Sequence, residues 1–199
     1  KKYFANILLL YAPRILKLIE KVKNAGIDIK MICPDHGVIW RENPLQIVAA
    51  YEKWCHQESE NKAVVVYDTM WHSTEKMAEV IASGISEEGV NLQAIHIRKS
   101  HRSDIMTEVL DARAVVIGSP TLNNQMFPTV ADFLCYMKGL KPAGKIGGAF
   151  GSYGWSGEAV KQITQELEAL KFELPVPGFR VQYVPGSDGM DACFEYGRQ

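Results

Sequence analysis

Residues 63–74 read AVVVYDTMWHST, and they carry the strongest indication of the fold class of the chain. Its first five residues, Ala63 to Tyr67, form a short continuous apolar run, which is typical of a buried strand in a parallel sheet. A polar loop follows at once, and a helix is predicted from Ser73 to Glu88. A strand, a loop and a helix in this order are the repeating unit of an α/β fold.

The same alternation continues toward the end of the chain. Further strands are predicted at residues 92–97, 114–118, 145–151 and 179–184. Further helices are predicted at residues 103–110, 128–137, 156–170 and 186–197. Five strands alternating with helices predict a doubly wound parallel sheet that is covered on both faces. Because crossovers between parallel strands are right-handed, the shortest topology has the strand order 2-1-3-4-5.

The first sixty residues follow a different rhythm. Apolar residues at helical spacing predict an amphipathic helix from Ile7 to Val22, with a break near Pro13. The elements predicted after it are a strand (Ile27–Cys33), a turn (Pro34–Gly37), a helix (Pro44–Glu58) and a polar linker (His56–Lys62). We therefore expect two domains, residues 1–60 and residues 61–199.

The composition excludes several classes of protein. Hydrophobic residues make up 47% of the 199 residues and charged residues 23%, which is a globular balance and argues against disorder. The 22 basic residues are scattered, so nucleic acid is not an expected partner. No apolar run approaches the roughly 18 residues of a membrane helix, and no signal peptide opens the chain. The four cysteines are far apart, so we expect reduced thiols in a cytoplasmic protein.

The loop after the first predicted strand, residues 68–75, is a candidate phosphate site. In an α/β sheet, ligands bind outside the carboxyl ends of the strands, where the strand order reverses. Thr69, Ser73 and Thr74 place three hydroxyls at a helix N-terminus, which favours an anion. The alternative is that Ser73 or Thr74 only caps the helix. The chain has no GxGxxG sequence and no Walker lysine here, so dinucleotide and P-loop sites are not expected.

Two more loops lie at the same predicted edge. Residues 118–125 are rich in amides and hydroxyls, which suit the polar edge of a flavin, although an ordinary polar turn is an alternative. Residues 151–158 combine three glycines with Tyr153 and Trp155, which offer flat apolar surface beside a ligand. A buried core Trp is the alternative for Trp155. A phosphate site, a hydrogen-bonding edge and an aromatic plate together describe flavin mononucleotide (FMN).

The residues expected to bind the cofactor come from these three loops. They are Thr69, Met70, Trp71, His72, Ser73, Thr74, Ser119, Pro120, Thr121, Leu122, Asn123, Asn124, Ser152, Tyr153, Gly154, Trp155, Ser156 and Gly157. No catalytic residue is expected in this chain beyond the flavin itself.

With these motifs in place, residues 62–199 resemble the flavodoxin superfamily, and more closely its flavodiiron branch, the A-type flavoproteins. The similar segments are Tyr67–Thr74, Gly118–Asn123 and Ser152–Glu158. Ordinary flavodoxins usually carry a glycine in the phosphate loop, and this chain has none there. Tyr3–Ile7 and Pro34–Arg41 resemble the closing stretch of the metallo-β-lactamase-like αββα domain that precedes the flavodoxin-like domain in that branch.

The resemblance implies a role for His36, which corresponds to the last ligand of a non-haem diiron centre. Imidazole suits iron, although a histidine beside a glycine is in general more often a simple turn residue. The other family ligands come from an upstream HxExDH cluster that this sequence lacks. The chain also has no initiator Met. We therefore expect it to be the C-terminal piece of a longer polypeptide, with an incomplete metal site.

The resemblance also implies a function. The longer protein is expected to reduce O2 to water, NO to N2O, or both, at the diiron centre. FMN is expected to receive electrons from rubredoxin or a reductase, within a head-to-tail homodimer or a homotetramer. This chain alone is expected to act only as the FMN electron-transfer part. The alternatives are a free-standing flavodoxin-type carrier, a flavodoxin-like quinone reductase and a non-enzymatic receiver-like domain.

Overall fold

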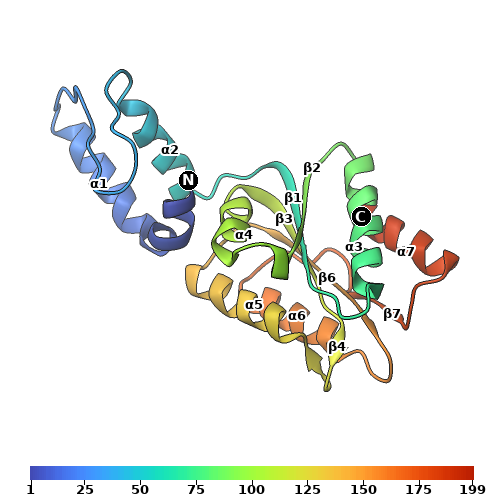
Figure 1. Cartoon of the computed structure of the whole chain (residues 1–199). Coiled ribbons are helices and arrows are strands. Elements are labelled where there is room, and N and C mark those ends of the chain that lie inside the picture. Colours follow the sequence, from blue (N-terminus) through green and yellow to red (C-terminus); the bar gives the residue numbers. More distant parts are fainter.

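A computed structural model describes all 199 residues and has a parallel five-stranded sheet at its centre (Figure 1). The strands are β1 (Glu60–Tyr67), β2 (Asn91–His96), β3 (Ala112–Gly118), β6 (Ile146–Tyr153) and β7 (Phe179–Gln182). Their order, β2-β1-β3-β6-β7, is the predicted 2-1-3-4-5 order, and every pairing is parallel. The flavodoxin-like fold class is confirmed.

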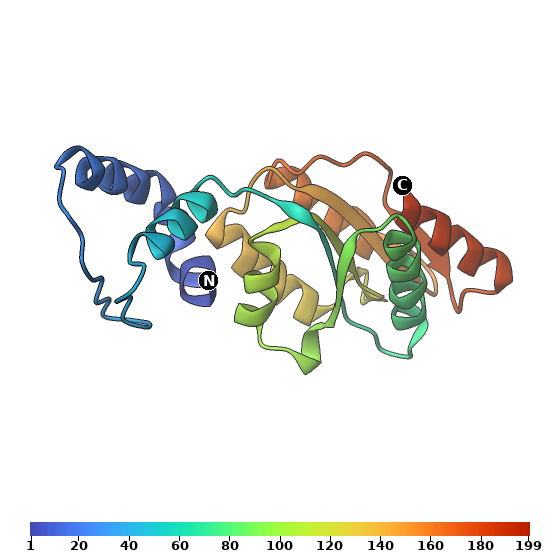
Figure 2. The ribbon, with the colours of Figure 1, turned by 90° about the horizontal axis from the view of Figure 1, so that it is seen from above.

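Five helices cover the two faces of the sheet. They are α3 (Ser73–Glu87), α4 (Arg102–Val109), α5 (Pro128–Leu140), α6 (Glu158–Ala169) and α7 (Ser187–Arg198). Successive residues of β1 face opposite sides, so that Val65 packs with α3 and α7 while Val64 packs with α4, α5 and α6. Figure 2 shows these two helical layers on either side of the strands. None of the helices is both long enough and apolar enough to cross a lipid bilayer.

The regular elements in the first sixty residues are helices, and the strand predicted there is wrong. Three helical segments, Phe4–Leu8 (π), Leu9–Tyr11 (3-10) and α1 (Ala12–Asn24), replace the predicted helix over 7–22, and α2 covers Leu45–Cys55. Over residues 27–33 the only pairing is a single bridge between Ile32 and Trp40. A strand needs a neighbour for its backbone groups, and these residues have no other strand beside them. No β-strand of the expected αββα domain is therefore present in residues 1–59.

The first strand of the sheet begins earlier than predicted. The linker was expected to reach Lys62, but β1 already begins at Glu60, whose N–H donates to the carbonyl of Asp111 (2.8 Å). The N-terminal helices pack on the sheet domain, because Phe4, Leu9 and Cys55 are buried in the same core cluster as α4 and α5. The two parts therefore share one apolar core.

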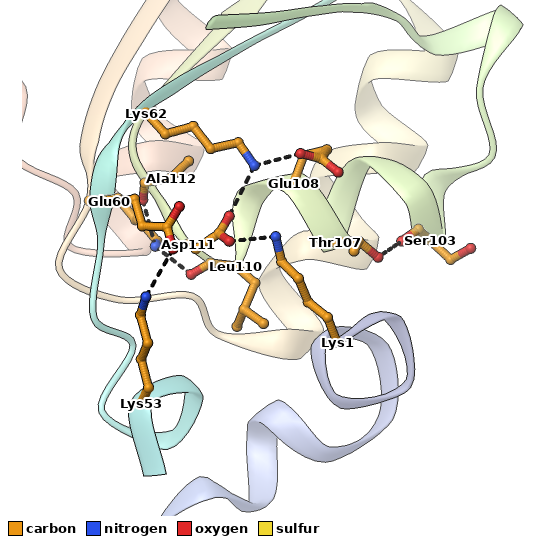
Figure 3. Close-up of polar contacts among 11 residues, drawn as sticks. Lys1, Lys53, Glu60, Lys62, Ser103, Thr107, Glu108, Leu110, Asp111 and Ala112 are labelled. Atoms are coloured by element: carbon orange, nitrogen blue, oxygen red, sulfur yellow. Dashed lines mark hydrogen bonds and ion pairs between the residues drawn. The ribbon is translucent and has the colours of Figure 1, made fainter. Parts of the chain in front are cut away.

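A buried ionic cluster lies at the amino ends of the strands (Figure 3). The Asp111 carboxylate pairs with Lys1 at 2.5 Å and with Lys62 at 3.0 Å, and Lys62 also reaches Glu108 at 2.5 Å. Beside them Lys145 is 1% exposed, and its ammonium donates to the carbonyls of Leu110 (2.9 Å) and Ala112 (2.7 Å). The cluster fastens the first residue of the chain to the sheet domain.

Lys145 predicts a pH dependence of stability. Burial lowers the pKa of its ammonium from the usual 10.5 to about 8. Between these two values the unfolded chain binds a proton that the folded chain does not, so this group makes the folded state more stable as the pH rises. Relative to Lys145→Met, the free energy of unfolding of the unmodified chain is expected to increase by about 1 kcal/mol from pH 8 to pH 9. Urea unfolding at both values measures it, and a constant difference between the two proteins would contradict it.

Candidate functional site

A cleft of about 710 Å³ lies at the carboxyl ends of β1, β3 and β6. This volume is within the range of roughly 300–1,000 Å³ that is usual for small-molecule sites. The predicted residues that line it are Thr69, Met70, Trp71, Ser73, Pro120, Thr121, Leu122, Asn123, Asn124, Ser152, Tyr153, Gly154, Trp155 and Ser156. The structure therefore brings the three predicted loops together around one cavity.

The β1–α3 loop presents free donors to this cleft. The N-cap of α3 is His72, in the left-handed region (φ 65°), and no side chain caps the first N–H groups of the helix. The alternative that Ser73 or Thr74 is the N-cap is therefore wrong. Thr69 is 2% exposed, and its Oγ1 is buried with no hydrogen-bond partner in the protein. A buried hydroxyl without a partner is costly, so a ligand oxygen at this place would relieve a defect of the free protein.

Four predicted residues do not line the cleft. The buried hydroxyls of Thr74 and Ser152 lie 2.9 Å apart, so that Thr74 joins α3 to β6. The hydroxyl of Ser119 accepts a hydrogen bond from the N–H of Phe127 (2.8 Å) and thus anchors the start of α5. The exposed imidazole of His72 lies 2.6 Å from the Glu75 carboxylate. A Cβ on Gly157 would lie only 2.9 Å from Arg180, so this glycine makes room for that side chain.

The loop after β3 contains a small hairpin that was not predicted. Its strands are β4 (Thr121–Leu122) and β5 (Gln125–Met126), and they pair antiparallel. Asn123 and Asn124 form the turn with φ of 51° and 59°. Positive φ at both central residues is the type I′ pattern that asparagine favours, so the Asn-Asn pair was an available signal. The Gln162 side chain accepts from the N–H of Met126 (2.8 Å) and holds the hairpin against α6.

Exposed aromatic side chains surround the cleft. Trp155 is 98% exposed and Trp71 is 79% exposed, so the alternative of a buried core Trp is wrong for Trp155. Tyr183 and Val184 also line the cleft, and the predicted set did not include them. They follow β7, whose carboxyl end lies at the same edge of the sheet, so the rule that named the other three loops also covers this one. Flat apolar groups on a cleft wall suit a planar ring system.

A buried carboxylate, that of Asp68, lies at the start of the β1–α3 loop. Burial alone would raise the pKa of Asp68, but the pKa lies below its usual value because the carboxylate accepts hydrogen bonds from Thr129, Thr69 and His96 and lies beside the Arg98 guanidinium. The site is therefore built on an ionised, fully satisfied Asp68.

His36 does not line this cleft. Its ring lies beside that of Tyr3, tilted by 34° with centroids 5.0 Å apart, at an apolar cavity of about 400 Å³ between α1 and α2. Nowhere in the chain do three His, Cys, Asp or Glu side chains gather in a way that could hold a metal ion. The residues present do not complete a metal site around His36, and its role as an iron ligand stays a prediction.

Known proteins match the sheet domain alone or the whole chain. Residues 65–197 match the flavodoxin family. A nitric oxide reductase of Moorella thermoacetica is 43% identical over 199 residues, which is all of this chain and 50% of that protein. The rubredoxin oxygen:oxidoreductase structure from Desulfovibrio gigas superposes with a TM-score of 0.96 at 44% identity, over 99% of this chain and 50% of that one. The structure of the flavodiiron protein of Giardia intestinalis superposes with a TM-score of 0.93 at 31% identity, over 99% of this chain and 49% of that one.

The chain thus spans about half the length of the relatives it matches. Because these similarities run through the N-terminal helices as well as the sheet domain, they favour the flavodiiron interpretation over a free-standing flavodoxin. The chain therefore belongs to the flavodoxin family, and along its whole length it is similar to half of a flavodiiron protein.

Proposed function

We propose that the cleft binds FMN and that residues 61–199 form an electron-transfer domain. The observation that carries this proposal is the uncapped N-terminus of α3 beside the buried, unpartnered hydroxyl of Thr69. Backbone N–H groups at a helix N-terminus and a free hydroxyl suit a phosphate. The hairpin and the aromatic residues then supply the polar and apolar surfaces for the ring. Bound FMN would supply one- and two-electron redox chemistry, and the protein side chains would position it and exclude water.

The geometry favours electron transfer to a second molecule. The segment between α1 and α2, which carries His36, lies at one end of the molecule, and the β4 hairpin beside the cleft lies in the sheet domain, well away from that segment (Figure 1). Figure 2 gives the same separation from above. If His36 contributes to a diiron centre, the cleft of the same chain is remote from it. We therefore propose a head-to-tail homodimer, or a homotetramer made of such pairs, in which the cleft of one copy faces the metal centre of another.

The names of the relatives indicate the reaction of the longer protein. One is a nitric oxide reductase and another a rubredoxin-oxygen oxidoreductase. We propose that residues 1–60 belong to a metallo-β-lactamase-like diiron domain with His36 as a ligand, that the complete protein reduces O2, NO or both, and that a small redox protein such as rubredoxin, or a reductase, donates the electrons. We also propose that it works in the cytoplasm.

Reconstitution of the 199-residue chain tests the electron-transfer role. After incubation with FMN and gel filtration, the protein is expected to keep the visible flavin absorption and to be reduced anaerobically by a reductant that donates to flavin. A colourless protein after gel filtration would overturn the proposal.

The same reconstituted chain is expected to give no sustained consumption of O2 or NO beyond free FMN at the same concentration. The reason is that no three metal-ligating side chains gather in it, so an iron centre cannot form from these residues alone. Gas electrodes measure this directly. Turnover well above free FMN would show that the cleft itself, rather than a metal centre, carries the reaction.

A further inference from the structure

The carboxylate of Asp68 joins four parts of the fold just before the phosphate loop. Asp68 is fully buried. Its Oδ1 accepts hydrogen bonds from the N–H of Thr69 (2.6 Å), from His96 at the end of β2 (3.0 Å) and from Nε of Arg98 (2.9 Å). Its Oδ2 accepts from the hydroxyl of Thr129 in the first turn of α5. One carboxylate thus ties the loop to the end of β2, to the 3-10 turn after it and to a helix.

Arg98 completes the hold on Thr69. While its Nε donates to Asp68, its Nη2 donates to the carbonyl oxygen of Thr69. Both backbone polar groups of Thr69 are therefore committed, the N–H to Asp68 and the C=O to Arg98. The side-chain Oγ1 is the remaining polar atom of this residue, and it is the one without a partner. The Asp68–Arg98 pair consequently holds the backbone from which the free hydroxyl extends.

The charges of this pair also matter for a phosphate. An isolated carboxylate directly behind the loop would repel a phosphate dianion. Arg98 is half exposed, contacts Asp68 and lies over the Phe127 ring at 5.8 Å, so that the pair is neutral as a unit. The carboxylate can therefore order the loop without an electrostatic penalty for the ligand.

We propose that Asp68 is a positioning residue for phosphate recognition, which sets the affinity of the cleft for FMN through Thr69 without touching the ligand. This inference rests on the proposed FMN site and adds a residue to it. It requires that the effect of Asp68 appear only for a ligand with a phosphate, and only while the hydroxyl of Thr69 is present.

A double-mutant cycle with two ligands tests the inference. Dissociation constants for FMN and for riboflavin, which lacks the phosphate, are measured for the unmodified chain, Asp68→Ala, Thr69→Val and the double variant. Each single substitution is expected to raise the Kd for FMN about tenfold and to change the Kd for riboflavin less than about twofold. The double variant is expected to match the single variants rather than to show the roughly hundredfold product of independent effects.

Three further variants provide a conservative substitution, a milder substitution and a control. Asp68→Asn retains an oxygen that accepts from Thr69 and Arg98, so it is expected to recover most of the lost FMN affinity. Thr129→Val removes the hydroxyl that donates to Asp68, with little change in shape, and it replaces Asp68→Ala in the cycle if that variant does not fold. It is expected to raise the Kd for FMN about threefold, and only when Thr69 is intact. Asp132→Asn, an exposed residue of α5 paired with Arg102, is the matched control and is expected to change nothing.

The outcomes distinguish the proposed FMN site from the proposed role of Asp68. If the unmodified chain does not bind FMN, the proposed function and this inference fail together. If it binds FMN but Asp68→Ala weakens riboflavin equally, or if the two substitutions multiply, only the role of Asp68 is overturned. Selective loss of FMN affinity that disappears in the Thr69→Val background supports it.

Discussion

Substituting Thr69→Val and Ser73→Ala together is expected to raise the Kd for FMN about 100-fold or more. Both residues line the cleft at the N-terminus of α3, and each offers a hydroxyl that can donate to a phosphate oxygen. A hydrogen bond to a charged group contributes about 1.5–3 kcal/mol, which corresponds to roughly tenfold or more for each hydroxyl. Quenching of flavin fluorescence during titration of protein into FMN measures the change.

The matched control for this pair lies on the same helix. Ser83 of α3 is exposed, and its hydroxyl donates to the carbonyl of Glu79 (2.9 Å) on the surface, away from the cleft. Ser83→Ala is expected to leave the Kd for FMN unchanged. If the double substitution at Thr69 and Ser73 binds FMN within about threefold of the unmodified chain, the loop does not recognise the phosphate as described.

The largest expected effect on stability comes from Gly84→Ala, in the last turn of α3. A Cβ at Gly84 would lie 2.2 Å from the carbonyl oxygen of Phe194 in α7, and one at Gly197 would lie 2.2 Å from the carbonyl oxygen of Ile81. The two helices thus meet backbone to backbone at a pair of glycines. Adding a methyl group forces them apart, and overpacking of this kind costs about 3 kcal/mol. Since about 1 kcal/mol shifts the melting temperature of a chain this long by roughly 2–4 °C, we expect a fall of about 6–12 °C.

Gly139→Ala is the control with the opposite sign. Gly139 lies in α5, and no atom lies within 4 Å of the Cβ that the substitution would add. Only the helix propensity changes at this position, and alanine is expected to raise the free energy of unfolding by about 0.5–1 kcal/mol relative to glycine. In thermal unfolding, the melting temperature of the unmodified chain is therefore expected to lie between those of the two variants. A Gly84→Ala protein as stable as Gly139→Ala would contradict the close contact of α3 and α7.

The regular core of the fold was predictable because its signals are local. Val64, Val65 and Val66 form an apolar run without polar interruption, and all three are fully buried in β1, an inner strand of the sheet. Turn residues and helix patterns then fixed the alternation of elements, and chirality left one short topology. The rule that ligands bind at the carboxyl edge selected three loops, and these loops do line one cleft.

The features that the sequence did not predict share one physical cause: they depend on contacts between residues that are far apart in the chain. Residues 27–33 alternate like a strand but find only one bridge partner. The hydroxyl of Thr74 faces Ser152, which is 78 positions away, so its contact could not be predicted from its own loop. Asp68 attracted no role in the sequence, because its partners His96, Arg98 and Thr129 come from elements that meet only in the folded sheet.

Titration of the unmodified chain with FMN and with riboflavin, under identical conditions, measures whether the cleft recognises the flavin phosphate. We expect saturable binding of about one FMN per chain, with an affinity at least tenfold higher than for riboflavin, because charge-assisted hydrogen bonds at the N-terminus of α3 recognise the phosphate. Equal affinity for the two flavins, or no saturable binding of FMN at all, would contradict it.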